Sequence, residues 1–315
     1  MKISAIITAY NYAGFLPAAI ESVLEQTRPA DEIVVVDDGS TDDTARVVAR
    51  YADRGVRYVY KANGGAGAAR NRGIRETSGE LVAFLDGDDR WVAGKLALQL
   101  AHLEKNADVG LVTGSEWQVY SSGAQPYLLR RLPVASAEFY PGILIENTIG
   151  NPSLALIRRE CFDKAGLFDE SMPLGQDWDM WIRLAMVCRV GVVDAPLILF
   201  NRHGGSLTAN KVLERYRSNL LIQRRYIRCV ADPMLRMRLF LSAYSMNLYY
   251  TAAALADSPQ PPAASSHRRL AFGMALASAL LNPAYETRNK AGLLARTAFG
   301  RPAFDRLRRI PASRR

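Results

Sequence analysis

Acidic residues and glycines gather at the ends of two apolar runs within the first ninety residues. The run Glu32–Asp37 leads into Asp38-Gly39-Ser40, and the run Glu80–Asp86 leads into Gly87-Asp88-Asp89. Two carboxylates separated by one glycine present oxygen ligands on one side of a tight turn, and such ligands suit a hard divalent cation that also binds substrate phosphates. The alternative for each cluster is a solvated turn that caps the following helix.

Two more polar segments follow apolar runs, and they exclude several familiar nucleotide and metal motifs. Thr8-Ala9-Tyr10-Asn11 stands where a dinucleotide-binding fold needs G-x-G-x-x-G, and the glycine-rich segment Asn63–Asn71 has Arg70 where a third glycine should fall. No G-K-[ST] phosphate loop is present, and Arg90 interrupts a calcium-binding pattern after Asp86. The polar segments therefore predict a ligand site of another kind.

The elements that must position these residues are short buried strands alternating with helices. Continuous apolar runs predict strands over Ile3–Thr8, Glu32–Asp37, Val56–Tyr60 and Glu80–Asp86. Apolar residues at helical spacing follow the first strand from Phe15 to Leu24 and the fourth from Val92 to Leu103, and Ser40–Asp43 predicts the start of a helix over 42–52. This alternation predicts an α/β fold, a mostly parallel sheet with helices on both faces, whose ligand lies at the carboxyl ends of the strands.

Beyond residue 109 the pattern loosens and then becomes helical. Further strands are predicted over Val109–Thr113, Leu154–Ile157, Val190–Val193 and Leu197–Phe200, with a helix over Trp178–Cys188 and a long cleft-forming loop over about 115–150. From 208 onward helices are predicted over roughly 209–230, 233–257, 267–281 and 286–299. We therefore expect a catalytic domain over 1–207 and a helical region over 208–315.

The charge of the chain is divided in the same way. Residues 1–201 carry 20 basic and 26 acidic side chains, whereas residues 202–315 carry 20 basic and only 5 acidic ones, so the net charge of +9 arises in the last third. The acidic first part and the lack of interleaved aromatic and basic residues argue against a nucleic-acid partner. Three scattered cysteines predict no disulfide framework, and neither a signal peptide nor a membrane-spanning helix is predicted.

Taken together, five motifs closely resemble the family 2 glycosyltransferases of the GT-A fold over about residues 1–205. They are, in order, Ile7-Thr8-Ala9-Tyr10-Asn11, Val36-Asp37-Asp38-Gly39-Ser40-Thr41-Asp42, Ala69-Arg70-Asn71-Arg72-Gly73, Leu85-Asp86-Gly87-Asp88-Asp89 and Gln176-Asp177-Trp178-Asp179. The resemblance implies an inverting transferase that moves a sugar from a nucleoside-diphosphate donor to a hydroxyl group. The family favours UDP as the nucleotide and a glycan or lipid-linked acceptor, as in cell-surface polysaccharide or lipopolysaccharide synthesis.

The resemblance also implies where the nucleotide lies. Thr8 and Tyr10 would line the base pocket, with Tyr10 stacked on the base, and Asp38 would accept a hydrogen bond from it. Arg70 would lie near the ribose or diphosphate, and Asp86 near the ribose or the metal. Without the resemblance, a core aromatic at a strand end, a turn residue and a solvated arginine are the simpler interpretations of Tyr10, Asp38 and Arg70.

For the metal, the resemblance implies Mn²⁺ or Mg²⁺ with Asp88 as the direct ligand. Asp86 and His203 would assist, since a neutral imidazole can serve as a further ligand. His203 follows the last predicted strand, and a structural role for it is equally compatible with the sequence. Asn151-Pro152-Ser153, Trp117 and Gly175 fall on the expected acceptor side of the cleft, without an assigned role.

The general base implied by the resemblance is Asp177. Inverting transfer needs a carboxylate that takes the proton of the acceptor hydroxyl. Asp179 is the fallback, and a helix N-cap is the simpler interpretation of Asp177. Gln176 departs from the usual Glu of the family, which leaves open a catalytically lapsed scaffold that only binds nucleotide sugars.

The basic last third predicts a location as well as a fold. The apolar segment Leu270–Leu281, the flanking His267-Arg268-Arg269 and the arginine-rich tail would suit an anionic membrane surface. We therefore expect a cytoplasmic enzyme bound peripherally to the inner face of the cell membrane. Solvated arginines on helices that pack as an ordinary subdomain are the alternative, and the one favoured for residues 208–257.

Overall fold

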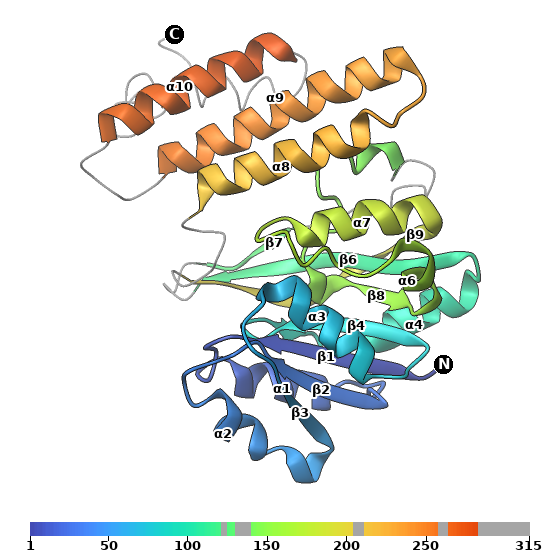
Figure 1. The fold of residues 1–315 in the computed structure, drawn as a ribbon. Helices are drawn as coiled ribbons and strands as arrows, with labels where there is room; N and C mark the ends of the chain where they lie inside the picture. Colours follow the sequence, from blue (N-terminus) through green and yellow to red (C-terminus); the bar gives the residue numbers. More distant parts are fainter. Residues whose placement is uncertain (121–124, 130–139, 204–210, 258–263, 283–315) are drawn as a thin grey trace, which may run out of the picture. The chain divides into compact units, whose positions relative to one another are not determined.

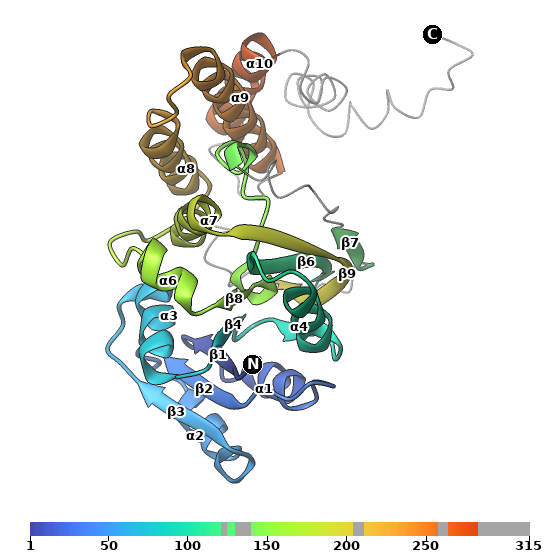
Figure 2. The ribbon, with the colours of Figure 1, turned by 90° about the vertical axis from the view of Figure 1, so that its right-hand side faces the viewer.

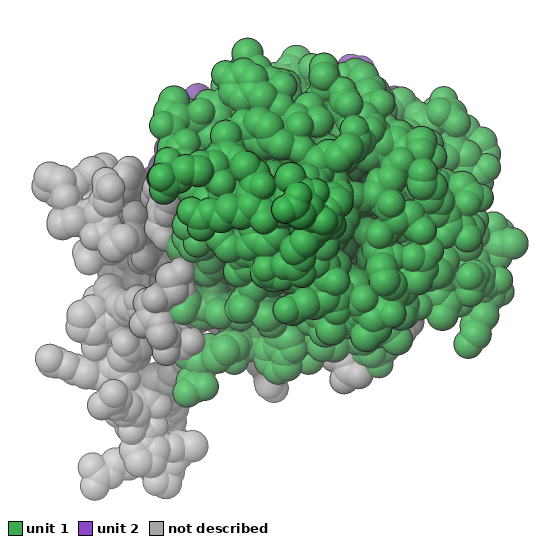
Figure 3. All heavy atoms as spheres, turned by 90° about the horizontal axis from the view of Figure 1, so that it is seen from below, with its two compact units in different colours: residues 1–143, 147–206 green, residues 144–146, 207–315 purple. Residues whose placement is uncertain are grey.

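The structure, a computed structural model, describes residues 1–120, 125–129, 140–203, 211–257 and 264–282. The chain divides into two compact units, which Figure 3 colours separately. Unit 1 comprises Met1–Ile143 and Asn147–Ser206, and unit 2 comprises Leu144–Glu146 and Leu207–Arg315. The roles predicted for the two regions, catalysis for 1–207 and membrane association for 208–315, stay predictions.

The first half of unit 1 is a parallel sheet built from the four runs of buried residues. Its strands are β1 (Ile3–Ala9), β2 (Glu32–Asp37), β3 (Val56–Tyr60) and β4 (Leu81–Asp86), in the order β3-β2-β1-β4. All seven residues of β1 are buried because sheet and helices cover it on every side. The register sets Thr8 beside Asp86 and Ala9 beside Asp37, so three polar strand ends meet at one edge of the sheet.

The second half of unit 1 makes the sheet mixed rather than mostly parallel. Its strands are β5 (Arg90–Trp91), β6 (Val109–Tyr120), β7 (Tyr127–Leu129), β8 (Leu156–Arg158) and β9 (Arg189–Arg202). β8 runs antiparallel to both of its neighbours, β4 and β6, so β6 regains the direction of β4, and β9 is parallel to β6. The α/β class is confirmed, whereas the parallel sheet ends at β4.

Two strand predictions were too short. The segments predicted over 190–193 and 197–200 belong to the single strand β9, whose pairing with β6 shifts register around Gly114 and Ser115. This irregularity accommodates Asp194 and Pro196, the polar and proline residues that suggested a break. β6 likewise continues to Tyr120, and β7 lies within the segment predicted as a loop.

Helices cover both faces of the sheet in unit 1, as predicted (Figures 1 and 2). They are α1 (Leu16–Leu24), α2 (Thr44–Ala49), α3 (Gly65–Glu76), α4 (Lys95–Lys105), α6 (Glu160–Ala165) and α7 (Gln176–Val187). Leu16, Leu96 and Leu103 of α1 and α4 join Ile3 and Ile7 in one core. On the other face the Phe84 ring contacts the edges of Phe162 and Phe168. α2 is shorter than predicted, because the chain passes into a short 3-10 helix (Ala52–Arg54) and a left-handed Gly55.

Unit 2 is helical in its described part. It contains α8 (Val212–Ile227), α9 (Pro233–Asp257) and α10 (Ala264–Leu281), near the bounds predicted, whereas the helix predicted over 286–299 lies outside the described residues. α9 and α10 pack through Ala252, Ala271 and Ala275, and the Ser245 hydroxyl donates to the Ser278 carbonyl at 2.9 Å. None of the described helices combines the length and apolar character needed to cross a membrane.

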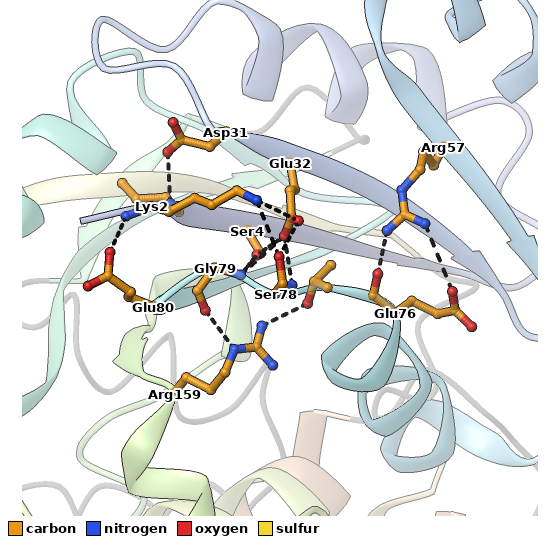
Figure 4. A network of polar contacts seen from close by, with 12 residues as sticks. Lys2, Ser4, Asp31, Glu32, Arg57, Glu76, Ser78, Gly79, Glu80 and Arg159 are labelled. Carbon is orange, nitrogen blue, oxygen red and sulfur yellow. Dashed lines mark hydrogen bonds and ion pairs between the residues drawn. The ribbon is translucent and has the colours of Figure 1, made fainter.

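The Glu32 carboxylate links the starts of three strands in unit 1 (Figure 4). It lies at the edge of the sheet opposite to the edge where the polar strand ends meet. Glu32 accepts hydrogen bonds from Ser4 Oγ at 2.5 Å, from Ser78 N and Oγ at 2.9 and 2.8 Å, and from Lys2 Nζ at 3.0 Å. Burial alone would raise the pKa of Glu32, but these donors hold it well below the ordinary glutamate value. The ionised carboxylate therefore stabilises the fold.

Replacing this carboxylate should destabilise unit 1 in a pH-dependent way. We expect Glu32→Gln to lower the free energy of unfolding at pH 7 by about 2 kcal/mol, because hydrogen bonds to a charged acceptor are lost. Since the folded pKa is depressed, this stabilisation is present above the ordinary glutamate pKa of about 4.3 and is lost as the pH falls below it. Urea unfolding at pH 7 and pH 3 measures the change, with Glu21→Gln, which removes the more exposed Arg54 pair, as the control. If the wild type and Glu32→Gln differed in unfolding free energy by the same amount at both pH values, this interpretation would be contradicted.

Candidate active site

The turn after β4 places Asp86 between two other strand-end residues. Thr8 Oγ1 of β1 donates to Asp86 Oδ1 at 3.2 Å, and Arg70 Nη2 of α3 donates to the same oxygen at 2.7 Å. Gly87 is needed at this turn, since a Cβ there would lie 3.0 Å from the Thr8 carbonyl oxygen and 3.3 Å from the Tyr12 ring. Three residues predicted for the nucleotide site, Thr8, Arg70 and Asp86, are thus brought together.

Asp88 meets His203 on the same turn. His203 Nε2 lies 2.9 Å from Asp88 Oδ2, and the imidazole stacks against Phe15 with 4.8 Å between the ring centroids. Burial, and next the negative charge of Asp86, raise the pKa of Asp88. Burial and the charge of Asp88 also raise the pKa of Tyr12, whose ring meets His203 edge-on. Tyr12 and Phe15 were missed by sequence reasoning, because Phe15 was assigned to the apolar face of the following helix and Tyr12 belongs to no predicted element.

The third carboxylate of the turn, Asp89, holds the turn in place. It is 1% exposed and accepts hydrogen bonds from Ser153 Oγ at 2.7 Å, from Asn151 Nδ2 at 3.0 Å and from the Asn201 backbone at 3.1 Å. Ser153 Oγ also accepts from the Asp86 backbone at 3.0 Å. Asn151 and Ser153, to which the sequence assigned no role, therefore fix the carboxylate turn to the segment before β8, and the Asn201 backbone fixes it to β9.

The predicted base-pocket residues occupy the ends of β1 and β2. The Tyr10 side chain is 44% exposed. Asp38 is buried and accepts from Lys61 Nζ at 2.5 Å and from the backbone of Gly64 and Gly65 at 2.9 and 2.8 Å. Asp38 thus fastens the glycine-rich segment at the start of α3, and its predicted contact with the base stays a prediction.

Asn11 clamps the two loops beside Tyr10. Its backbone is left-handed, with φ 55°, and its side-chain oxygen accepts from the Thr41 backbone at 2.8 Å. Its own backbone N–H donates to Ser40 Oγ at 2.9 Å. The motifs after β1 and β2 are therefore fixed to one another. Asparagine is a residue type that tolerates this conformation.

Asp177 lies on the first turn of α7, after the left-handed Gly175. Burial raises its pKa, while the positive charge of Arg70 opposes that shift and the negative charge of Asp86 adds to it. Asn147 Nδ2 donates to Asp177 Oδ2 at 3.2 Å. A Cβ on Gly67 of α3 would lie 3.5 Å from the Gln176 side chain, so α3 and α7 approach closely here. Asp177 is therefore within electrostatic reach of the nucleotide-site residues.

The fallback base Asp179 has a different environment. It is buried, and its Oδ2 accepts from both Arg183 Nε and Nη2 at 2.9 Å. Arg183 Nη1 donates in turn to the Ala165 carbonyl of α6. Asp179 thus joins α7 to α6 and is not placed to receive a proton from a substrate.

Metal ligands are only partly assembled by the protein itself. Among the described residues, no three His, Cys, Asp or Glu side chains are spaced to hold a metal ion by themselves. Asp88 and His203 touch, and Asp86 acts electrostatically on Asp88, but the three do not form a ready-made ligand set. Substrate oxygens would have to complete the coordination of any ion bound here.

Comparison of the sequence with known proteins finds a family and similar proteins. A family model described as glycosyl transferase family 2 covers residues 4–166. An uncharacterized glycosyltransferase of Rickettsia typhi is 33% identical over 222 residues, which cover 68% of this chain and 67% of that protein.

Solved structures share the fold. The crystal structure of Staphylococcus aureus TarS 1–349 in complex with UDP-GlcNAc matches 96% of this chain and 93% of its own, with a TM-score of 0.69 and 18% identity. The mannosyltransferase PcManGT of Pyrobaculum calidifontis, in complex with GDP-Man and Mn²⁺, matches 95% of this chain and 86% of its own, with a TM-score of 0.56 and 24% identity.

Proposed function

Because the chain belongs to glycosyl transferase family 2 and is a glycosyltransferase, we propose that it transfers a sugar with inversion from a UDP-sugar to a hydroxyl of a glycan or lipid-linked acceptor. The observation that carries this proposal is the electrostatic coupling of Asp86, Arg70 and Asp177, which belong to three separate motifs. Arg70 lies 2.7 Å from Asp86, and both charges act on the carboxylate of Asp177.

In the proposed reaction the Asp177 carboxylate takes the proton of the acceptor hydroxyl. The hydroxyl oxygen forms a bond to the anomeric carbon of the donor while the bond from that carbon to the diphosphate breaks, so UDP leaves with its electron pair. Asn147 orients Asp177 through its hydrogen bond. Arg70 holds Asp86 and supplies positive charge between the donor and acceptor sides.

The residues of the β4 turn fit a divalent cation. Asp88 and Asp86 supply hard oxygen donors, and the raised pKa of Asp88 follows from burial and from the charge of Asp86. Asp88 Oδ2 lies 2.9 Å from His203 Nε2. Asp88 would hold Mn²⁺ or Mg²⁺ directly, with Asp86 and His203 beside it. When bound, the cation neutralises the diphosphate and so makes UDP a better leaving group.

Nucleotide binding is the direct test of this function. With Mn²⁺ present, UDP and a UDP-sugar at about a hundred times their dissociation constants should stabilise the protein by about 2.7 kcal/mol, and ADP should not. A thermal-shift screen of nucleotides and nucleotide sugars measures this and identifies the base. Stabilisation by GDP or dTDP alone would overturn the choice of UDP, and stabilisation by none of them would overturn the donor site.

We also propose that unit 2 brings the enzyme to an anionic membrane at the cytoplasmic face, where lipid-linked acceptors for cell-surface glycans lie. Leu270, Leu276 and Leu280 of α10 are 43%, 43% and 76% exposed, and basic side chains outnumber acidic ones twenty to five over 202–315. Each cation near such a surface adds about 1 kcal/mol. Co-sedimentation with phosphatidylglycerol vesicles at 150 mM salt should retain the full chain, and vesicles of neutral lipid alone should not. Recovery of equal amounts of protein with the anionic and the neutral vesicles would contradict this location.

A further inference from the structure

The ends of β6 and β9 lie at the same edge of the sheet as the carboxylate turn. β8 is antiparallel to both β4 and β6, so two reversals return β6 to the direction of β4, and β9 follows β6 in parallel. Tyr120 and Arg202, the last residues of β6 and β9, are paired in register. The next residue after Arg202 is His203, which touches Asp88. A group at these two strand ends is therefore next to the proposed reaction centre.

Two tyrosines and an arginine gather there. β7 pairs antiparallel with β6 and sets Tyr127 opposite Gln118 (Figure 2). The ring centroids of Tyr120 and Tyr127 are 6.1 Å apart at 33°, and Tyr127 is 44% exposed. The positive charge of Arg202 and the negative charge of Glu116 both act on Tyr127. An aromatic surface beside a cation thus faces solvent at the carboxyl edge of the sheet.

The Arg202 guanidinium is held in one orientation without an acidic partner. Its Nε donates to Gln118 Oε1 at 2.5 Å, and its Cζ lies 5.1 Å from the centroid of the Phe200 ring. Gln118 donates in turn to Oε1 of Glu116, so the amide links the guanidinium to this buried carboxylate. Within the described ranges, no carboxylate lies at ion-pair distance from Arg202. These contacts leave the two Nη groups of an oriented cation to bind an anion.

We propose that Tyr120, Tyr127 and Arg202 form an acceptor subsite for a sugar that carries an anionic group, either a phosphate ester or a carboxylate. This inference rests on the proposed function. A tyrosine ring offers an apolar face to the C–H groups of a sugar and a hydroxyl to its polar groups. A guanidinium binds a phosphate or carboxylate through two parallel hydrogen bonds, which a lysine could not reproduce. The three residues would thus select an anionic acceptor over a neutral sugar.

The test measures binding of small anionic sugars to the full chain saturated with UDP and Mg²⁺. Saturation-transfer NMR titrations would use glucose 1-phosphate, galactose 1-phosphate and glucuronic acid, with methyl glucoside as the neutral probe. We expect at least one anionic sugar to bind at least tenfold more tightly than methyl glucoside. Arg202→Gln and Tyr127→Leu should each weaken that binding at least fivefold. Comparing the sugar phosphates with glucuronic acid shows whether the subsite binds a phosphate ester or a carboxylate.

The controls separate this inference from the proposed function. Arg189→Gln removes a paired arginine at the opposite end of β9 and should leave sugar binding unchanged. All variants should bind UDP with dissociation constants within twofold of the wild type, which also shows that they fold. Equal binding of methyl glucoside, insensitivity to Arg202→Gln, or no binding of any anionic sugar would overturn the subsite. Loss of UDP binding in the wild type would instead overturn the proposed function.

Discussion

The Asp177→Asn variant should lose sugar transfer by a factor of about 10²–10⁴ and keep its affinity for UDP within about twofold. An amide has the size of the carboxylate and can still hydrogen bond with Asn147, but it cannot accept the proton of the acceptor hydroxyl. Asp177 lies on the first turn of α7, a different element from the β4 turn proposed to hold the diphosphate, and it is assigned to the acceptor hydroxyl, so the change should affect donor binding little. Release of UDP in the presence of acceptor, with a parallel UDP titration, measures both properties.

The matched control is Asp163→Asn, an exposed carboxylate on α6 in the same unit. It should retain transfer within about twofold, since a solvated surface charge contributes little. Asp179→Asn should lower stability, because it leaves Arg183 without its buried partner. If Asp177→Asn kept more than a tenth of the transfer rate, the base would have to be another group.

Removing the divalent cation should have an effect of similar size. We expect EDTA to lower transfer at least about 100-fold, and Mn²⁺ or Mg²⁺ to restore it, because stabilisation of the leaving diphosphate is worth several kcal/mol. Asp88→Ala should lower both transfer and UDP affinity, since it removes the direct ligand and the partner of His203. His203→Ala should also lower transfer and UDP affinity, but by a smaller factor of about ten.

The control for chelation is the melting temperature of the nucleotide-free protein, which should not change in EDTA if the ion acts only with the substrate. Asp53→Ala, a change of an exposed carboxylate outside the site, controls for loss of charge. Undiminished transfer in EDTA, or normal UDP affinity in Asp88→Ala, would contradict the proposed metal site.

Sequence patterns predicted which strand-end residues lie together, because that arrangement depends on local features; their roles toward a donor stay predictions. Buried runs such as Ile3–Thr8 predict strands. Residues that directly follow parallel strands lie at one edge of the sheet, independently of the loop conformations. The pairing of Thr8 with Asp86 follows from this rule.

Residues that act through distant partners could not be predicted. Asn147 reaches Asp177 across 30 positions, and Asn151 and Ser153 reach Asp89 across more than 60. None of these contacts leaves a periodic or local pattern in the sequence. The reversal of β8 was missed for the same reason, since a buried three-residue strand reads alike in either direction.

The reversed strand β8 is the joint between the parallel half of the sheet in unit 1 and the half that contains β6 and β9. It touches β4 through three residue pairs and β6 through two, so few contacts at this strand constrain what lies beyond it. The family match ends at residue 166, shortly after β8, so it covers the parallel half with the carboxylate turn and also β5, β6 and β7, but neither α7 nor β9. An exchange of everything from α7 onward would have to preserve the contacts of β9 with the carboxylate turn, from Asn201 to Asp89 and from His203 to Asp88. Chimeras joined just after β8 would take Arg202 from the second parent but Tyr120 and Tyr127 from the first, so both parents should contribute to acceptor preference.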